Sequence, residues 1–134
     1  MKKAFLSLSF KHKAELESIT ATIVNTFRGF NIDVIVFAQE FCFSKGEEEK
    51  MMNTALEYIK NSDIFIAEVS YKEIGIGIEA GYAKALNKQI VYLKSNDSEL
   101  STTLLGIASI MIEYKNVEEL ENKLLEAKNK LSIM

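Results

Sequence analysis

Two kinds of segment alternate along the chain when its hydrophobic and polar positions are followed. Short, almost continuously apolar runs are typical of parallel strands that are covered on both faces. Between them, apolar residues recur every three or four positions, as in Leu16, Ile19, Ile23 and Phe27, which is the spacing of a buried helix face. The strands predicted in this way are residues 3–10, 32–37, 64–69, 89–93 and 110–114.

The predicted helices follow the first, second, third and fifth strands, and several of their ends carry capping signals. Gly29 is a natural stop, and Ser44 followed by Glu47 has the spacing of a capping box, as has Asn116 followed by Glu119. The predicted helices are residues 14–28, 44–61, 77–87 and a last helix after residue 116, in which Val117, Leu120, Leu124 and Leu131 face inward.

Regular alternation of strand and helix predicts parallel strands joined by crossover helices. The 134 residues fit one domain, residues 1–134. We therefore expect an α/β, three-layer, flavodoxin-like (Rossmann-like) fold with a five-stranded parallel sheet in the order 2-1-3-4-5. Ligands of such folds bind at the carboxyl ends of the strands, near the switch point between strands 1 and 3.

Composition removes several classes of function. A single cysteine, Cys42, and a single histidine, His12, exclude an intrachain disulfide and the usual zinc clusters, so no metal is expected. The net charge of −3 argues against nucleic acid and anionic membrane as partners. With no signal peptide and no apolar run near the ~20 residues of a membrane helix, we expect a cytoplasmic protein. Arg28 is the one arginine, so bidentate arginine clamps on phosphate are nearly excluded.

The segment after the third predicted strand carries the densest chemical signal. Glu79 falls in the first turn of the predicted helix 77–87, where the positive end of the helix dipole would hold it ionised. Gly75 and Gly77 leave room for a ligand to approach the backbone, and Gly81 with Ala83 would let the helix lie close to the sheet. Glu79 is therefore well placed to act as a nucleophile on a sugar carbon. Its alternative role is that of a carboxylate that caps the helix.

This segment also resembles a known family. The nucleoside 2-deoxyribosyltransferase superfamily, and within it the 2'-deoxynucleoside 5'-phosphate N-hydrolases most closely, has a Gly-x-Gly-x-Glu-x-Gly-x-Ala run followed by a lysine-rich step. The specific part of the resemblance spans residues 63–88. The matching positions are Gly75, Gly77, Glu79, Gly81, Ala83 and Lys88.

The resemblance implies an N-glycosidase or a 2-deoxyribosyl transferase, without a cofactor, that acts on a nucleoside or its 5'-monophosphate. Glu79 would attack the anomeric carbon and form a glycosyl-enzyme intermediate. The family shares residues between subunits, so the resemblance also implies a homodimer or a higher homo-oligomer. Ser101 matches a serine that a neighbouring subunit supplies to the phosphate. Its alternative role is a helix N-cap.

Three departures from the family pattern leave the substrate open. The turn after the first strand, residues 7–13, has neither the glycines nor the arginine of the N-hydrolases. Ala55 stands where the family usually has an aspartate. Glu73 stands where the N-hydrolases have a phosphate-binding serine and the transferases an acid, and an acid there would repel a 5'-phosphate. The base, the need for a phosphate, and hydrolysis versus transfer therefore stay open.

Four further residues are candidates for contact with the substrate. Ser7 and Ser9 end the first strand, where they either bind a ligand or only terminate the strand. Glu68 ends the third strand and has either a catalytic role or a hydrogen bond to a neighbouring loop. Glu73 is a loop acid that binds the ligand or faces solvent. The departing base needs a proton, for which Glu68, Glu73 or a bound water is the candidate.

Two other functions compete with the first. The opening FLSLSFKHKAE and the strand NSDIFIAEVS also resemble TIR domains, which suggests cleavage of a nicotinamide dinucleotide, although the Gly-x-Gly-x-Glu run fits that family less well. A non-catalytic nucleotide-binding relative of the first family is the other alternative.

Overall fold

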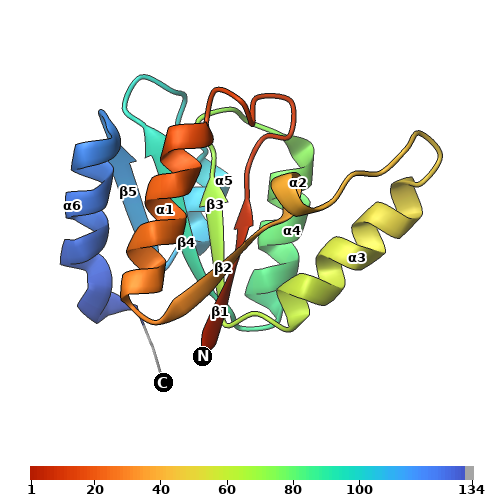
Figure 1. Ribbon diagram of the computed structural model, residues 1–134, viewed down its shortest axis with the longest axis horizontal. Coiled ribbons are helices and arrows are strands. Elements are labelled where there is room, and N and C mark those ends of the chain that lie inside the picture. Colours follow the sequence, from red (N-terminus) through yellow and green to blue (C-terminus); the bar gives the residue numbers. More distant parts are fainter. Residues whose placement is uncertain (132–134) are drawn as a thin grey trace.

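The computed structural model describes residues 1–131, and these residues form a five-stranded parallel sheet with helices on both faces (Figure 1). The strand order is β2-β1-β3-β4-β5. The predicted α/β architecture and strand order are therefore confirmed. The strands are β1 (Lys2–Ser7), β2 (Ile32–Val36), β3 (Ile64–Glu68), β4 (Gln89–Ser95) and β5 (Ile110–Tyr114).

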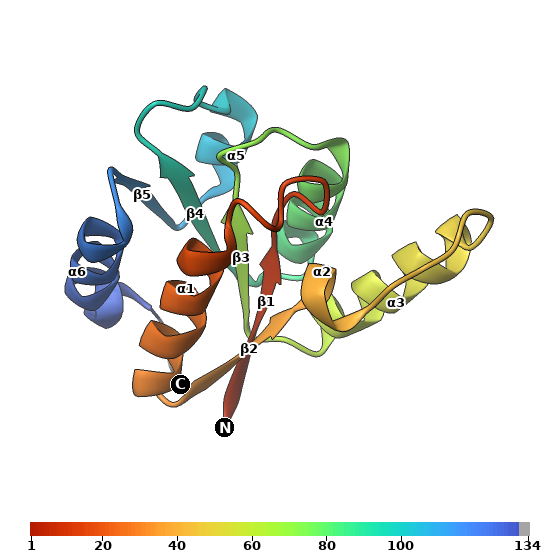
Figure 2. The same cartoon turned by 45° about the horizontal axis from the view of Figure 1, so that its top comes forward.

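The helices divide between the two faces of the sheet. One face is covered by α1 (Glu17–Gly29) and α6 (Val117–Ala127), and the other by α3 (Glu48–Lys60), α4 (Ile74–Ala85) and α5 (Thr102–Ile107). A one-turn helix, α2 (Phe37–Glu40), follows β2 directly. In the turned view, α3 and the loop before it project away from the body of the molecule (Figure 2).

Side chains of the strands alternate between two separate cores. Ile64 and Ile66 of β3 belong to the core under α1 and α6, whereas Phe65 and Ala67 belong to the core under α4. All five residues of β3 are buried, because the strand is central and both of its faces are covered. This burial explains why the strands read as continuous apolar runs.

Two element boundaries differ from the sequence prediction in ways that affect the site. Strand β1 ends at Ser7, because the backbone then turns and Ser9 Oγ accepts a hydrogen bond from His12 N–H. Helix α4 begins at Ile74, three residues before the predicted start at Gly77. Its buried face starts at Ile76, so the exposed glycines concealed the first turn. Glu79 consequently lies in the second turn of α4.

One predicted helix cap is confirmed, and of the other only one of its two expected hydrogen bonds is present. Asn116 Oδ1 accepts a hydrogen bond from Glu119 N–H at the start of α6, as predicted. At α3, Ser44 N–H donates to Glu47 Oε1, but Ser44 supplies no side-chain cap and the helix begins at Glu48. Val117 is exposed, against the prediction that it faces inward, because α6 turns it to the solvent side.

Gly81 does not have the packing role expected of it. It is exposed, and a Cβ added there would meet no other atom within 4 Å. Ala80 and Ala83 are completely buried instead, and these two residues bring α4 close to the sheet. The predicted role of Gly81 was wrong because the helix phase places it on the solvent side.

Within residues 1–131, no helix is long and apolar enough to cross a membrane. The same residues contain no group of three or more histidine, cysteine, aspartate or glutamate side chains placed to hold a metal ion.

Candidate active site

A cavity of about 360 Å³ opens at the carboxyl ends of β1 and β2, beside the first half of α4. Its polar side chains are Ser7, Lys11, Glu73 and Glu79. Most of the remaining lining is apolar and comes from the strand ends, from α2 and from α3. These residues are Leu6, Leu8, Phe10, Phe37, Ala38, Phe41, Met51, Met52, Gly75 and Ile76.

Glu79 enters this cavity from the second turn of α4 and is only 9% exposed. Ser7 Oγ donates a hydrogen bond to Glu79 Oε1 over 2.6 Å. Burial raises the pKa of Glu79, and the bond from Ser7 acts in the opposite direction. Glu79 does not lie in the first turn, where the helix dipole was expected to act on it, and burial is the largest influence on its pKa.

A second serine–glutamate bond lies next to the first. Ser9 Oγ donates to Glu73 Oε2 over 2.5 Å, and Glu73 is the residue that precedes α4. The structure brings Ser7, Glu73 and Glu79 together at one cavity, while Ser9 bonds to Glu73 and is not part of the lining.

The apolar wall of the cavity consists of residues that were not among the site residues named from the sequence. Phe37 and Phe41 have ring centroids 4.8 Å apart, and Met51 and Met52 of α3 complete the wall. The signal was present in the phenylalanines that follow the second strand and in the consecutive methionines. Aromatic rings and methionine thioethers form a surface that suits a flat heteroaromatic ring.

Glu68 lies on the other face of the sheet and does not reach this cavity. It is 1% exposed and accepts hydrogen bonds from Ser70 N–H (3.0 Å), Ser70 Oγ (2.6 Å) and the Tyr114 hydroxyl. Burial raises the pKa of Glu68, against the lowering influence of these bonds. Of the two roles considered for Glu68, the structure displays the hydrogen bond to a neighbouring loop.

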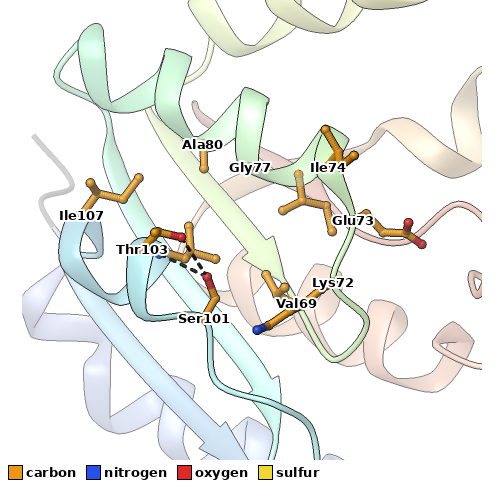
Figure 3. A pocket seen from close by; sticks show the side chains of 11 residues that line it. Val69, Lys72, Glu73, Ile74, Gly77, Ala80, Ser101, Thr103 and Ile107 are labelled. Carbon is orange, nitrogen blue, oxygen red and sulfur yellow. Dashed lines mark hydrogen bonds between the residues drawn. The ribbon is translucent and has the colours of Figure 1, made fainter.

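Ser101 caps α5, where its Oγ accepts a hydrogen bond from Leu104 N–H. It lines a second cavity of about 540 Å³ between α4 and α5 (Figure 3). The figure shows Ser101 and Thr103 on the α5 side, whereas Glu73 points away from them. Within one chain, Ser101 therefore lies apart from the cavity of Glu79, and Glu73 and Ile76 line both cavities.

Gly75 and Gly77 belong to different cavities. Gly75 lines the cavity of Glu79, and Gly77 lines the one beside α5. Both are exposed, and a Cβ at either position would meet no atom within 4 Å. The packing of the described residues therefore does not demand a glycine at either place, and contact with a ligand stays a prediction.

Positive charge is scarce at the cavity of Glu79. Lys11 is the one basic residue in its lining, against the two carboxyl groups of Glu73 and Glu79. Lys13 is engaged with the backbone oxygen of Ala38 at 3.3 Å. Arg28 is on α1, on the other face of the sheet, and bonds to Asn25.

Comparison with solved structures finds the same fold in proteins that process nucleosides and nucleotides. A CMP N-glycosidase of Clostridium botulinum is 21% identical, with a TM-score of 0.67 over 92% of this chain and 98% of that one. A 2-deoxyribosyltransferase of Bacillus psychrosaccharolyticus is 18% identical, with a TM-score of 0.66 over 90% of each chain. A conserved protein of Enterococcus faecalis is 15% identical, with a TM-score of 0.71 over 94% of this chain and 98% of that one.

The fold of these neighbours agrees with the fold that the resemblance over residues 63–88 implied. At identities of 21% and below, what they share with this chain is the fold. Comparison with protein-family models and with curated protein sequences gives no match.

Proposed function

We propose that this protein cleaves the bond between base and sugar in a nucleoside, with Glu79 as the nucleophile. The observation that carries the proposal is the position of Glu79, whose buried carboxyl group faces a cavity at the carboxyl end of a parallel sheet. The same cavity is also lined by the aromatic and methionine side chains of Phe37, Phe41 and Met51. In a nucleoside, the base can contact the aromatic side chains while the sugar lies beside the carboxylate.

In the proposed reaction, Glu79 attacks the anomeric carbon while the bond from that carbon to the base nitrogen breaks. The electron pair of the broken bond leaves with the base, which takes up a proton. Glu79 then holds the sugar as an ester, and water or a second base displaces it and regenerates the carboxylate. Positive charge develops on the sugar in both steps, and the adjacent carboxylate stabilises it. Deoxy sugars are favoured, because a 2'-hydroxyl withdraws electrons from this centre.

The proton for the departing base comes from Glu73 or from a bound water. Glu73 supports the first choice, because it lines the same cavity as Glu79. Glu68 is dropped from the candidates, because it bonds to Ser70 and Tyr114 on the other face of the sheet.

The charges of the cavity support a substrate without a phosphate group. A 5'-phosphate brings up to two negative charges next to Glu73 and Glu79, with Lys11 as the single cation in the lining. We therefore propose a nucleoside in preference to its monophosphate, and we leave hydrolysis and transfer as alternatives.

We also propose that the protein forms homodimers or higher homo-oligomers. In the apolar run at residues 104–112, Leu104, Ile110 and Ile112 are buried, whereas Leu105 is 43% exposed. Larger exposed apolar side chains occur on α4, where Ile74 is 85% and Ile78 54% exposed. A second copy on this face would remove both from water. A cytoplasmic setting stays part of the proposal, consistent with the free, exposed Cys42.

A panel of 2'-deoxynucleosides, ribonucleosides, their 5'-monophosphates and NAD, assayed for free base by chromatography, tests the function. Release of base from deoxynucleosides supports the proposal, and release from monophosphates alone overturns its substrate. Release of nicotinamide from NAD supports the TIR-like alternative. Binding of deoxynucleosides without turnover, measured by calorimetry, supports the non-catalytic alternative.

A further inference from the structure

We propose that Ser7 is a positioning residue that fixes which oxygen of Glu79 attacks the substrate. The inference rests on the proposed function of Glu79, and it concerns a residue first expected to bind the substrate itself. Ser7 Oγ holds Oε1 of Glu79 over 2.6 Å, although the two residues are 72 positions apart. Oε2 is thereby left as the oxygen that can reach the cavity.

The state of Oε2 supports this division of roles. Among the described residues, Ser7 is the one hydrogen-bond partner of the Glu79 side chain. In residues 1–131, the only fully buried side-chain oxygen or nitrogen atom without a hydrogen-bond partner is Thr20 Oγ1. Glu79 Oε2 also has no partner among these residues, so it is not fully buried. We infer that it is accessible from the cavity that Glu79 lines.

Both partners of the bond are mounted on rigid elements. Ser7 ends β1, which is hydrogen-bonded to β2 and β3 on its two sides, and its Cα pairs with that of Ala67. Glu79 precedes Ala80 on α4, and Ala80 and Ala83 are completely buried against the sheet. A hydroxyl on a central strand and a carboxyl on a docked helix have little freedom to separate, which is what positioning requires.

The hydroxyl of Ser7 also favours the ionised form of Glu79, because a donor binds a carboxylate more strongly than a carboxylic acid. Burial acts the other way and raises the pKa of Glu79. Loss of the hydroxyl therefore has two expected effects. The pKa of Glu79 rises further, and the carboxylate loses its fixed orientation.

The test compares Ser7→Ala and Ser7→Cys with Ser62→Ala. Ser62 is a buried serine at the opposite end of the sheet, 2% exposed, whose Oγ donates to the Tyr58 backbone oxygen. The readouts are the pH profile of kcat/KM for a deoxynucleoside and the titration of the Glu79 carboxyl carbon by NMR. Cysteine is similar in size to serine, and its thiol is a weaker hydrogen-bond donor than a hydroxyl group. With two variants, the test can still be made if one of them does not fold.

We expect Ser7→Ala to lower kcat/KM near neutral pH about ten- to a hundredfold, the usual range for a hydrogen bond to a charged group. We also expect the acid limb of its pH profile of kcat/KM, and the NMR titration of its Glu79, to move to higher pH. Ser7→Cys should be intermediate, and Ser62→Ala should be unchanged. An unchanged limb and titration in both Ser7 variants overturns the inference. If the parent releases no base, the proposed function fails. The NMR titration still shows whether Ser7 affects the pKa of Glu79, so the two failures can be distinguished.

Discussion

Glu68 and Glu79 are the two buried carboxyl groups of the described chain, and they lie on opposite faces of the same sheet. Burial raises the pKa of each. Glu68 is enclosed by hydrogen bonds from Ser70 and Tyr114, whereas Glu79 has one bond, from Ser7, and faces a cavity. Burial thus raises the pKa of a carboxyl group within a hydrogen-bonded network on one face and of the proposed nucleophile on the other.

We expect the contribution of Glu68 to the stability of the protein to fall as pH rises. Its pKa is higher in the folded than in the unfolded chain, so the folded state holds its proton longer. Its stabilising contribution is complete below the ordinary glutamate pKa and is lost as pH rises through the folded pKa. Urea unfolding at pH 4, 6 and 8 should show that Glu68→Gln gains stability relative to the parent as pH rises. Glu121→Gln, on the exposed side of α6, is the control. A constant difference between parent and Glu68→Gln across this range contradicts the assignment.

Phe41→Ala should weaken the use of every nucleoside substrate. The ring lines the cavity. Stacking of a base on an aromatic side chain is worth about 1–3 kcal/mol. We expect kcat/KM to fall by that free energy while folding is retained. Phe43→Ala is the matched control, because Phe43 stacks on Phe41 at 6.1 Å but does not line the cavity. Equal losses in the two variants would indicate a packing effect instead of base binding.

Glu73→Ser should shift preference toward 5'-monophosphates. Two unit charges about 6 Å apart interact by roughly 3 kcal/mol at an effective dielectric constant of 20, so removing the acid relieves repulsion of a phosphate. We expect the ratio of kcat/KM for monophosphate to that for nucleoside to rise roughly tenfold or more. Glu49→Gln, exposed in the first turn of α3 and outside the cavity, should leave that ratio unchanged. A ratio that does not move in Glu73→Ser would exclude Glu73 as the determinant.

Ile74→Lys should reduce the molar mass measured by light scattering. The side chain is 85% exposed on α4, and a lysine in a self-association surface places a charge where an apolar contact is needed. Leu125→Lys changes a side chain that is 51% exposed on α6, on the other face of the molecule, and should leave the mass unchanged. A parent protein that is a strict monomer at assay concentration would refute the proposed oligomer.

The sheet could be predicted from the sequence because central parallel strands are buried on both faces. Residues 64–69 and 90–93, in the central strands β3 and β4, read as apolar runs for that reason. The helical periods between the strands leave one strand order as the natural choice. The start of α4 was harder to predict, because Ile74, Gly75 and Gly77 are exposed and disrupt the pattern of the buried face. The one-turn helix α2 is too short to show a period at all.

The candidate site was only partly predictable. The sequence placed Ser7, Glu68 and Glu79 correctly at the carboxyl end of the sheet, but that end has two faces, and the cavity lies on only one of them. The apolar wall depends on how α3 packs beside α2, so Phe41 and Met51 meet through tertiary contacts that no local spacing records.

Replacement of Glu79 by glutamine tests the central claim most directly. Glutamine keeps the size of the side chain and removes the nucleophilic carboxylate, and loss of a nucleophile costs on the order of 4–8 kcal/mol in barrier. The measurement is the rate of free-base release from a 2'-deoxynucleoside, with the fold of the variant checked by circular dichroism. We expect Glu79→Gln to lose several orders of magnitude in this rate. Retention of the rate within about tenfold of the parent, roughly 1.4 kcal/mol, would show that Glu79 is not the nucleophile.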